Sequence, residues 1–161
     1  MVQDASAAEA NPPVPPDRTT MTRVDFYVIS RGGENARLLT ACRISDKAWR
    51  QGYKVLVRAA DEKQAESVDS LLWTFKDDSF VPHERWQAGQ AVEAPILIAC
   101  NAYPPSFADV LVNLGHDHPS ESACPARVTE IVDASQEGRA KGRDRFRHYR
   151  NLGFELHTHE L

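Results

Sequence analysis

A basic segment near the end of the sequence holds the residues best suited to binding chemistry. Residues 138–151 read GRAKGRDRFRHYRN and contain six of the nineteen Lys and Arg residues of a chain whose net charge is −4. On a helix that turns about 100° per residue, four arginines fall within about 80° of one another: Arg139, Arg143, Arg147 and Arg150. Phe146 lies on the same side of the helix. Such a surface fits an acidic ligand that ends in an aromatic group, although a solvated basic face is the common alternative.

A pair of glycines, Gly32 and Gly33, follows the first strand-like segment, where many doubly wound proteins hold a phosphate on backbone N–H groups. The full dinucleotide and P-loop patterns are absent, so a plain glycine turn competes with a nucleotide- or phosphate-dependent enzyme of Rossmann-like fold. No Ser or Cys lies in a nucleophile elbow and no carboxylate pair stands out. The sequence therefore predicts no catalytic site.

Histidines occur in two closely spaced pairs, His116 with His118 and His157 with His159, and Cys124 follows the first pair. Alternate residues of a strand point to the same face, so either pair could supply two metal ligands. Without further ordered Cys, Asp or Glu partners this spacing is weak evidence for a metal site. We predict no metal and no cofactor.

Large apolar residues gather at the end of the second predicted helix and in the loop after it. Trp73 ends the helix, and Phe80, Pro82 and His83 follow within ten residues. One interpretation is burial beneath the loop. The other is a cluster of anchors that binds a protein partner.

Composition limits the class of protein. The chain has 161 residues, of which 42% are hydrophobic and 26% charged, and its pI is about 5.8, which predicts one globular domain over residues 21–161. The acidic balance argues against a protein that coats nucleic acid, so DNA contact should be mainly indirect. Residues 1–20 are rich in Pro and small residues and are expected to form a disordered tail. No membrane span or signal peptide is visible, so we expect a cytoplasmic protein.

Strand and helix patterns alternate along the chain. Apolar periodicity predicts helices over 35–51, 62–73 and 136–151 and strands over 24–29, 54–58, 95–99, 109–114, 128–133 and 154–158. This order predicts a three-layer α/β/α fold with a central, mostly parallel mixed sheet, Rossmann-like without a dinucleotide fingerprint.

Several short motifs, taken in order and spacing, resemble the chi subunit of the bacterial DNA polymerase III holoenzyme. They are DEKQA at 61–65, LW at 72–73, SFVPH at 79–83 and RFRHYRNLGFELHT at 145–158. Weaker similarity covers FY at 26–27 and WRQGYKVL at 49–56, so the resemblance extends from about Met21 to the end of the sequence.

The resemblance implies an accessory, non-catalytic subunit with two partners. One partner is the psi subunit of the clamp loader, and the residues implied in that contact are Trp73, Phe80, Pro82 and His83. The other is the acidic C-terminal tail of single-stranded DNA-binding protein, and the residues implied there are Arg139, Arg143, Phe146 and Thr158. The family commonly has Tyr where this chain has Phe146, so ring packing is kept here without a phenolic hydrogen bond.

Overall fold

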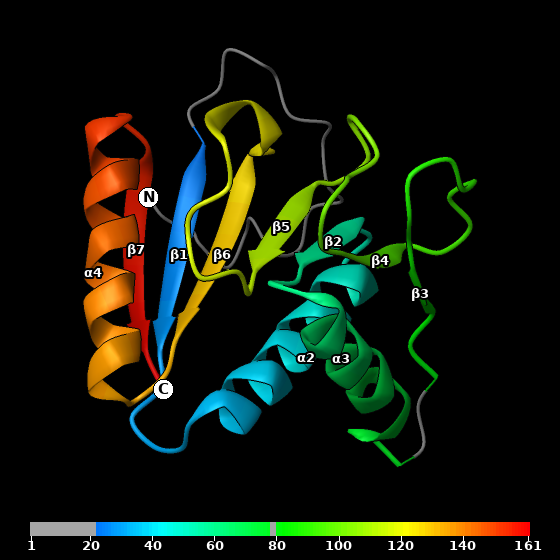
Figure 1. Cartoon of the computed structure of the whole chain (residues 1–161), viewed down its shortest axis with the longest axis horizontal. Helices are drawn as coiled ribbons and strands as arrows, with labels where there is room; N and C mark the ends of the chain where they lie inside the picture. The colour runs from blue at the N-terminus through cyan, green and yellow to red at the C-terminus, as the bar shows by residue number, and fades with distance from the viewer. Residues whose placement is uncertain (1–21, 78–79) are drawn as a thin grey trace.

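The structure is a computed structural model that describes residues 22–77 and 80–161. The predicted tail over residues 1–20 lies outside this range, as do Asp78 and Ser79. A seven-stranded sheet runs through the centre, with the strand order β3-β4-β2-β5-β6-β1-β7 (Figure 1). All of its pairings are parallel, so the sheet is more uniform than the mixed sheet that the sequence predicted.

The predicted elements are present, with bounds that differ by one or two residues. The helices are α2 (Glu34–Arg50), α3 (Glu62–Thr74) and α4 (Gln136–Asn151), with a short 3₁₀ helix, η1, at Glu121–Ala123. The strands are β1 (Arg23–Val28), β2 (Val55–Arg58), β3 (His83–Arg85), β4 (Ile96–Ala99), β5 (Val110–Asn113), β6 (Arg127–Val132) and β7 (Glu155–Glu160). Strand β3 and the 3₁₀ helix η1 are the elements that the sequence did not predict, because three residues are too few to show a period.

Side chains of alternate strand residues supply two apolar cores, one on each face of the sheet. Val55 and Val57 of β2 pack in the core beneath α2 and α3, whereas Leu56 points to the other core. On that second face α4 covers the β6, β1 and β7 side, and Trp86, Tyr103 and Phe107 contribute to the rest of the core. The result is the expected three-layer arrangement, with α2 and α3 on one face of the sheet and α4 on the other (Figure 1).

The basic helix α4 begins at a defined cap and lies very close to the sheet. The Ser135 hydroxyl accepts a hydrogen bond from the Gly138 amide at 2.9 Å, which satisfies one free N–H of the first turn. Farther along, a Cβ added to Gly142 would lie 2.8 Å from a methyl carbon of Val132 on β6. Only glycine permits this approach. The close contact fixes which face of α4 packs on the sheet, and therefore which faces are left to solvent.

Strands β3 and β7 form the two edges of the sheet. Six spacings of about 4.8 Å separate them, so the edges are about 29 Å apart. The two clusters that the sequence singled out are divided between them, since Trp73 and Phe80 lie near β3, and α4 packs against β7.

Candidate protein-binding surfaces

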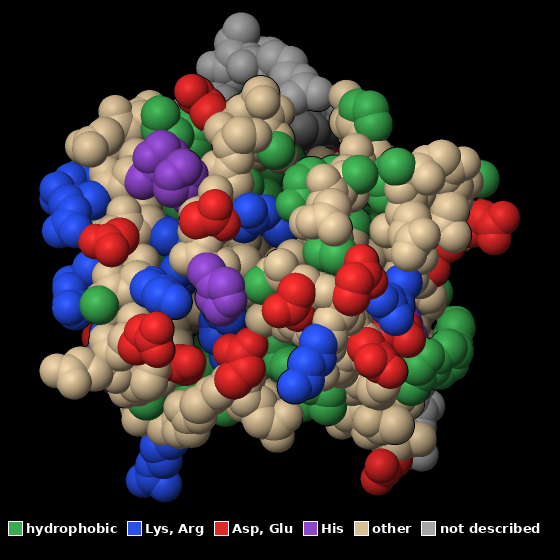
Figure 2. All heavy atoms as spheres, viewed as in Figure 1, with side chains coloured by type: hydrophobic (Ala, Val, Ile, Leu, Met, Phe, Trp, Pro, Cys, Tyr) green, Lys and Arg blue, Asp and Glu red, His purple; other side chains and the backbone are tan. Residues whose placement is uncertain are grey.

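Helix α4 has two flanks of different character. One flank faces the loop that follows β5, where the Arg145 guanidinium donates to the backbone oxygen of His116 and the His148 ring stacks on His118. The opposite flank faces β7, because Phe146 contacts Phe26 of β1 on that side. Figure 2 shows Lys and Arg side chains gathered along the side of the molecule that α4 occupies.

Cations on the flank that faces the β5 loop are neutralised within the chain. Lys141 pairs with Glu137 at 3.3 Å, and the buried Arg145 pairs with the buried Glu130 at 2.7 Å. Neither cation is left to attract an acidic partner at full strength.

Three arginines on the flank that faces β7 have no such partner: Arg139, Arg143 and Arg150. Among residues 22–77 and 80–161, none of the three makes an ion pair with Asp or Glu, and all three are exposed. Arg147, the fourth arginine of the predicted arc, pairs with Asp144. Arg139 Nε donates to the Ala134 carbonyl at 3.4 Å, but no carboxylate of the described residues neutralises any of the three. The flank that faces β7 therefore presents cationic guanidinium groups that can bind an acidic ligand.

The apolar part of this surface lies between the arginines and β7. The Phe146 ring is half-buried and packs on Phe26, with ring centroids 5.3 Å apart. Thr158 of β7 is exposed and lies opposite Phe26 in the strand register, on the same face of the sheet as α4. The structure thus brings together the four residues that the sequence implied for one site, Arg139, Arg143, Phe146 and Thr158, on one side of the molecule.

A buried polar network holds α4 in this orientation. The Glu130 carboxylate accepts hydrogen bonds from Arg145 Nε at 2.7 Å, the Tyr149 hydroxyl at 2.6 Å and Asn113 Nδ2 at 2.8 Å. Burial, together with the neighbouring Glu130 carboxylate, raises the pKa of the Tyr149 hydroxyl well above its usual value, so this group remains a donor. Three donors surround one carboxylate, and two of them come from α4.

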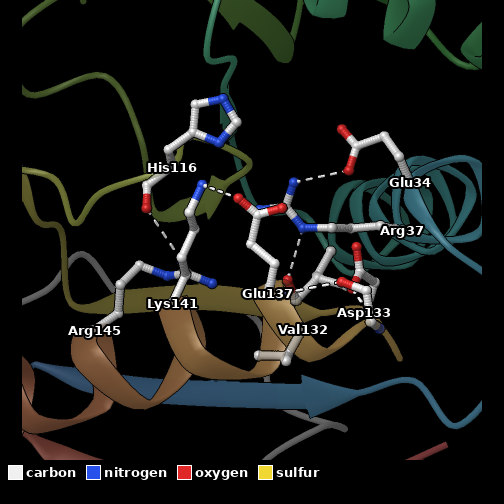
Figure 3. Close-up of a pocket in the computed structure, with 12 residues that line it drawn as sticks. Glu34, Arg37, His116, Val132, Asp133, Glu137, Lys141 and Arg145 are labelled. Atoms are coloured by element: carbon white, nitrogen blue, oxygen red, sulfur yellow. Dashed lines mark hydrogen bonds and ion pairs between the residues drawn. The ribbon is translucent and has the colours of Figure 1, made fainter.

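A pocket of about 250 Å³ opens at the carboxyl ends of β5 and β6, between the first turns of α2 and α4 (Figure 3). Arg37, Lys141 and Arg145 line it, and so do Glu34, Asp133 and Glu137. Figure 3 shows Arg37 turned toward Glu34 and Lys141 turned toward Glu137, and both pairs are 3.3 Å apart. Because acids and bases balance, the charge of the pocket does not favour a phosphate.

Gly32, the first residue of the glycine pair, is explained by the turn that it forms. Gly32 has φ of 85°, which lies in the left-handed region that favours glycine. A Cβ at Gly32 would also lie 2.8 Å from the Cβ of Ala36. A tight turn into α2 is therefore sufficient reason for this glycine.

The histidine pairs lie apart and have other partners. His118 stacks on His148 with centroids 3.4 Å apart, while His159 stacks on Tyr27 and lies 2.8 Å from the Asp25 carboxylate. Burial raises the pKa of the Cys124 thiol to about 12, so the free thiol is protonated at neutral pH. Across the part of the chain that the structure describes, no three His, Cys, Asp or Glu residues are grouped to hold a metal ion.

A second exposed surface, the Trp73 patch, is formed by Trp73 and Phe80. Their side chains are 56% and 61% exposed, and their rings lie 5.4 Å apart. Two such large rings in contact and open to solvent are unusual on a chain that functions alone.

The buried His83 side chain packs against the inner side of this patch. Its ring meets Trp73 edge-on at 4.9 Å, and its side chain is almost fully buried. Nδ1 donates to the Val81 carbonyl at 2.6 Å, and Nε2 lies 3.0 Å from the Asp69 carboxylate. Of the four residues implied for this contact, Trp73 and Phe80 are exposed, Pro82 is half-buried beside them, and His83 positions the Trp73 ring.

Comparisons with known proteins identify the family of this chain. Residues 21–157 match the family described as DNA polymerase III chi subunit, HolC. DNA polymerase III subunit chi of Pseudomonas aeruginosa is 41% identical over 141 residues, which cover 88% of this chain and 98% of the relative. The subunit chi of Escherichia coli is 31% identical over 143 residues, covering 86% of this chain and 97% of the relative. The chain belongs to the DNA polymerase III chi subunit family, which acts in DNA replication.

Proposed function

We propose that this chain is an accessory subunit that links the clamp loader, through psi, to single-stranded DNA-binding protein by binding its acidic C-terminal tail. One observation carries the tail assignment. The cations on one flank of α4 are neutralised, whereas Arg139, Arg143 and Arg150 on the other flank make no ion pair with Asp or Glu of the described residues and lie on the same side of the helix as Phe146. Free guanidinium groups bind the acids and the terminal carboxylate of the tail, and the ring packs against its terminal Phe.

The Trp73 patch supports the psi assignment. It lies at the edge of the sheet opposite to α4 and β7, so one chain can hold both partners without overlap. The role is one of binding, and the proposal assigns the chain no reaction of its own. No helix among the described residues is long and apolar enough to cross a membrane.

The tail assignment is tested by calorimetric titration of the wild-type chain with a synthetic peptide of the host's single-stranded DNA-binding protein tail. A saturable heat with one site per chain is expected. The same peptide without its terminal Phe should bind much more weakly. It lacks the aromatic ring, and its terminal carboxylate is displaced by one residue. Absence of binding by the complete peptide would refute the assignment.

The psi assignment gives its own prediction. Changing Trp73 or Phe80 to Ala should weaken psi binding by about 2 kcal/mol or more, because exposed aromatic anchors dominate such interfaces. The free energy of unfolding should change by less than about 1 kcal/mol, since truncation of a buried aromatic residue would instead cost about 3–5 kcal/mol.

Paired urea unfolding and psi titration measure both quantities. The matched control is Arg143→Glu, which lies at the other edge and should leave psi affinity unchanged. A loss of stability without a selective loss of psi binding would show that the two rings are structural.

A further inference from the structure

The outer edge of β7 is open. Strand β7 is last in the sheet order, and within residues 22–77 and 80–161 its only strand neighbour is β1. An open edge presents unpaired backbone N–H and C=O groups that can accept another strand.

Two hydrogen bonds fix which residues of β7 have free backbone groups. The Glu155 amide donates to the Thr22 carbonyl at 3.0 Å, and the Leu161 amide donates to the Val28 carbonyl at 3.0 Å. Backbone groups alternate in direction along a strand, so the odd-numbered residues bond to β1. The amides and carbonyls of Leu156, Thr158 and Glu160 therefore point outward, along about 13 Å of free edge.

The side chains of these three residues lie on the same face of the sheet as α4. Their register partners are Val24, Phe26 and Val28 of β1, and the Phe26 ring contacts Phe146 of α4. The free arginines run beside this edge, because Arg139 and Arg150 are separated by about 17 Å along the helix axis. A row of cations and a row of free backbone groups of similar length thus lie next to each other.

We propose that the acidic tail peptide binds in an extended conformation along the outer edge of β7, as an eighth strand. Backbone hydrogen bonds to Thr158 and its alternate neighbours hold the peptide, while its acidic side chains on the α4 face meet Arg139, Arg143 and Arg150. This proposal rests on the proposed function and deepens it. The charge of the flank identifies the occupant as an acidic peptide, whereas a second copy of this edge would bring the arginines of the two α4 helices against like charges.

The test is a set of tail peptides that each carry one backbone N-methyl group, titrated into the wild-type chain. N-methylation removes a donor, so in an edge-bound strand every second position should lose about tenfold or more in affinity. The positions between them should stay within about threefold of the unmodified peptide. Loss without alternation, or no loss at any position, would overturn the strand addition while leaving tail binding intact. Failure of the unmodified peptide to bind would refute the proposed function itself.

A pair of variants tests the same edge from the protein side. Thr158→Pro removes the outward N–H, and proline is tolerated on an edge strand where that group faces away from the sheet. It should lower tail affinity by about tenfold or more relative to Thr158→Ala, which keeps the backbone donor and removes only the side-chain contact. Unchanged psi affinity shows that Thr158→Pro is folded. Equal effects of the two variants, or a dimer of the free chain that the peptide does not dissociate in sedimentation, would overturn the proposal.

Discussion

Arg143→Glu should lower the affinity for the tail peptide by at least about 100-fold, or on the order of 3 kcal/mol. The change removes a charge-assisted hydrogen bond from the free flank of α4 and places a carboxylate against an acidic ligand. Arg143 is exposed and makes no ion pair with Asp or Glu among the described residues, so the fold loses no ion pair. Calorimetric titration measures the loss, and an unchanged melting temperature confirms the fold.

Lys141→Glu is the matched control. It makes the same change of net charge two residues away, but on the flank that faces the pocket, where Lys141 is already paired with Glu137. Tail affinity should fall by only about threefold, because only the long-range field changes. Raising the salt concentration should weaken the wild-type complex and reduce the difference between the two variants. Equal losses in both variants would mean that net charge, and not this flank, determines binding.

Glu130→Leu should cost about 3–5 kcal/mol of unfolding free energy, because it leaves the buried Arg145 without its partner. Glu130 is 0% exposed and Arg145 is 4% exposed, so water cannot replace the lost carboxylate. The variant also removes the acceptor of Tyr149 and Asn113. Urea unfolding measures the cost directly.

Glu137→Leu provides the comparison for an exposed pair on the same helix. Its carboxylate is mostly solvent-exposed and pairs with Lys141, so its loss should cost no more than about 1 kcal/mol. A cost for Glu130→Leu as small as this would show that α4 is held by apolar packing alone. Adding Arg145→Met to Glu130→Leu should recover part of the stability, since no buried charge then remains unpaired.

Periodicity predicted the three helices and six of the seven strands, because each had enough residues to show its period. It also predicted that four arginines share one side of α4, which depends only on the geometry of a helix. It could not show that Arg147 is paired while Arg139, Arg143 and Arg150 have no acidic partner among residues 22–77 and 80–161. That difference depends on which acids the fold places within reach.

The features of the candidate sites that the sequence could not predict are those that depend on contacts between residues far apart in the chain. Glu130 reads as one more strand residue, yet it is the buried acceptor for Arg145 and Tyr149, 15 and 19 positions away. The resemblance implies His83 at the psi contact, and the sequence does not show that its side chain is buried 3.0 Å from the Asp69 carboxylate, against the ring of Trp73. No local pattern in the sequence signals such long-range pairings.

The placement of the Trp73 patch and the β7 edge on opposite sides of one sheet has a quantitative consequence. Sites about 29 Å apart on a single sheet share no side chain, so their binding free energies should add without cooperativity. Under the proposed function, a chain that holds psi carries the tail-binding site at a fixed position on the assembly. Capture of the tail would then be an intramolecular event wherever single-stranded DNA-binding protein lies nearby on the same DNA. The local effective concentration, set by the length of the tail, would raise the avidity of the whole assembly well above the affinity of either contact.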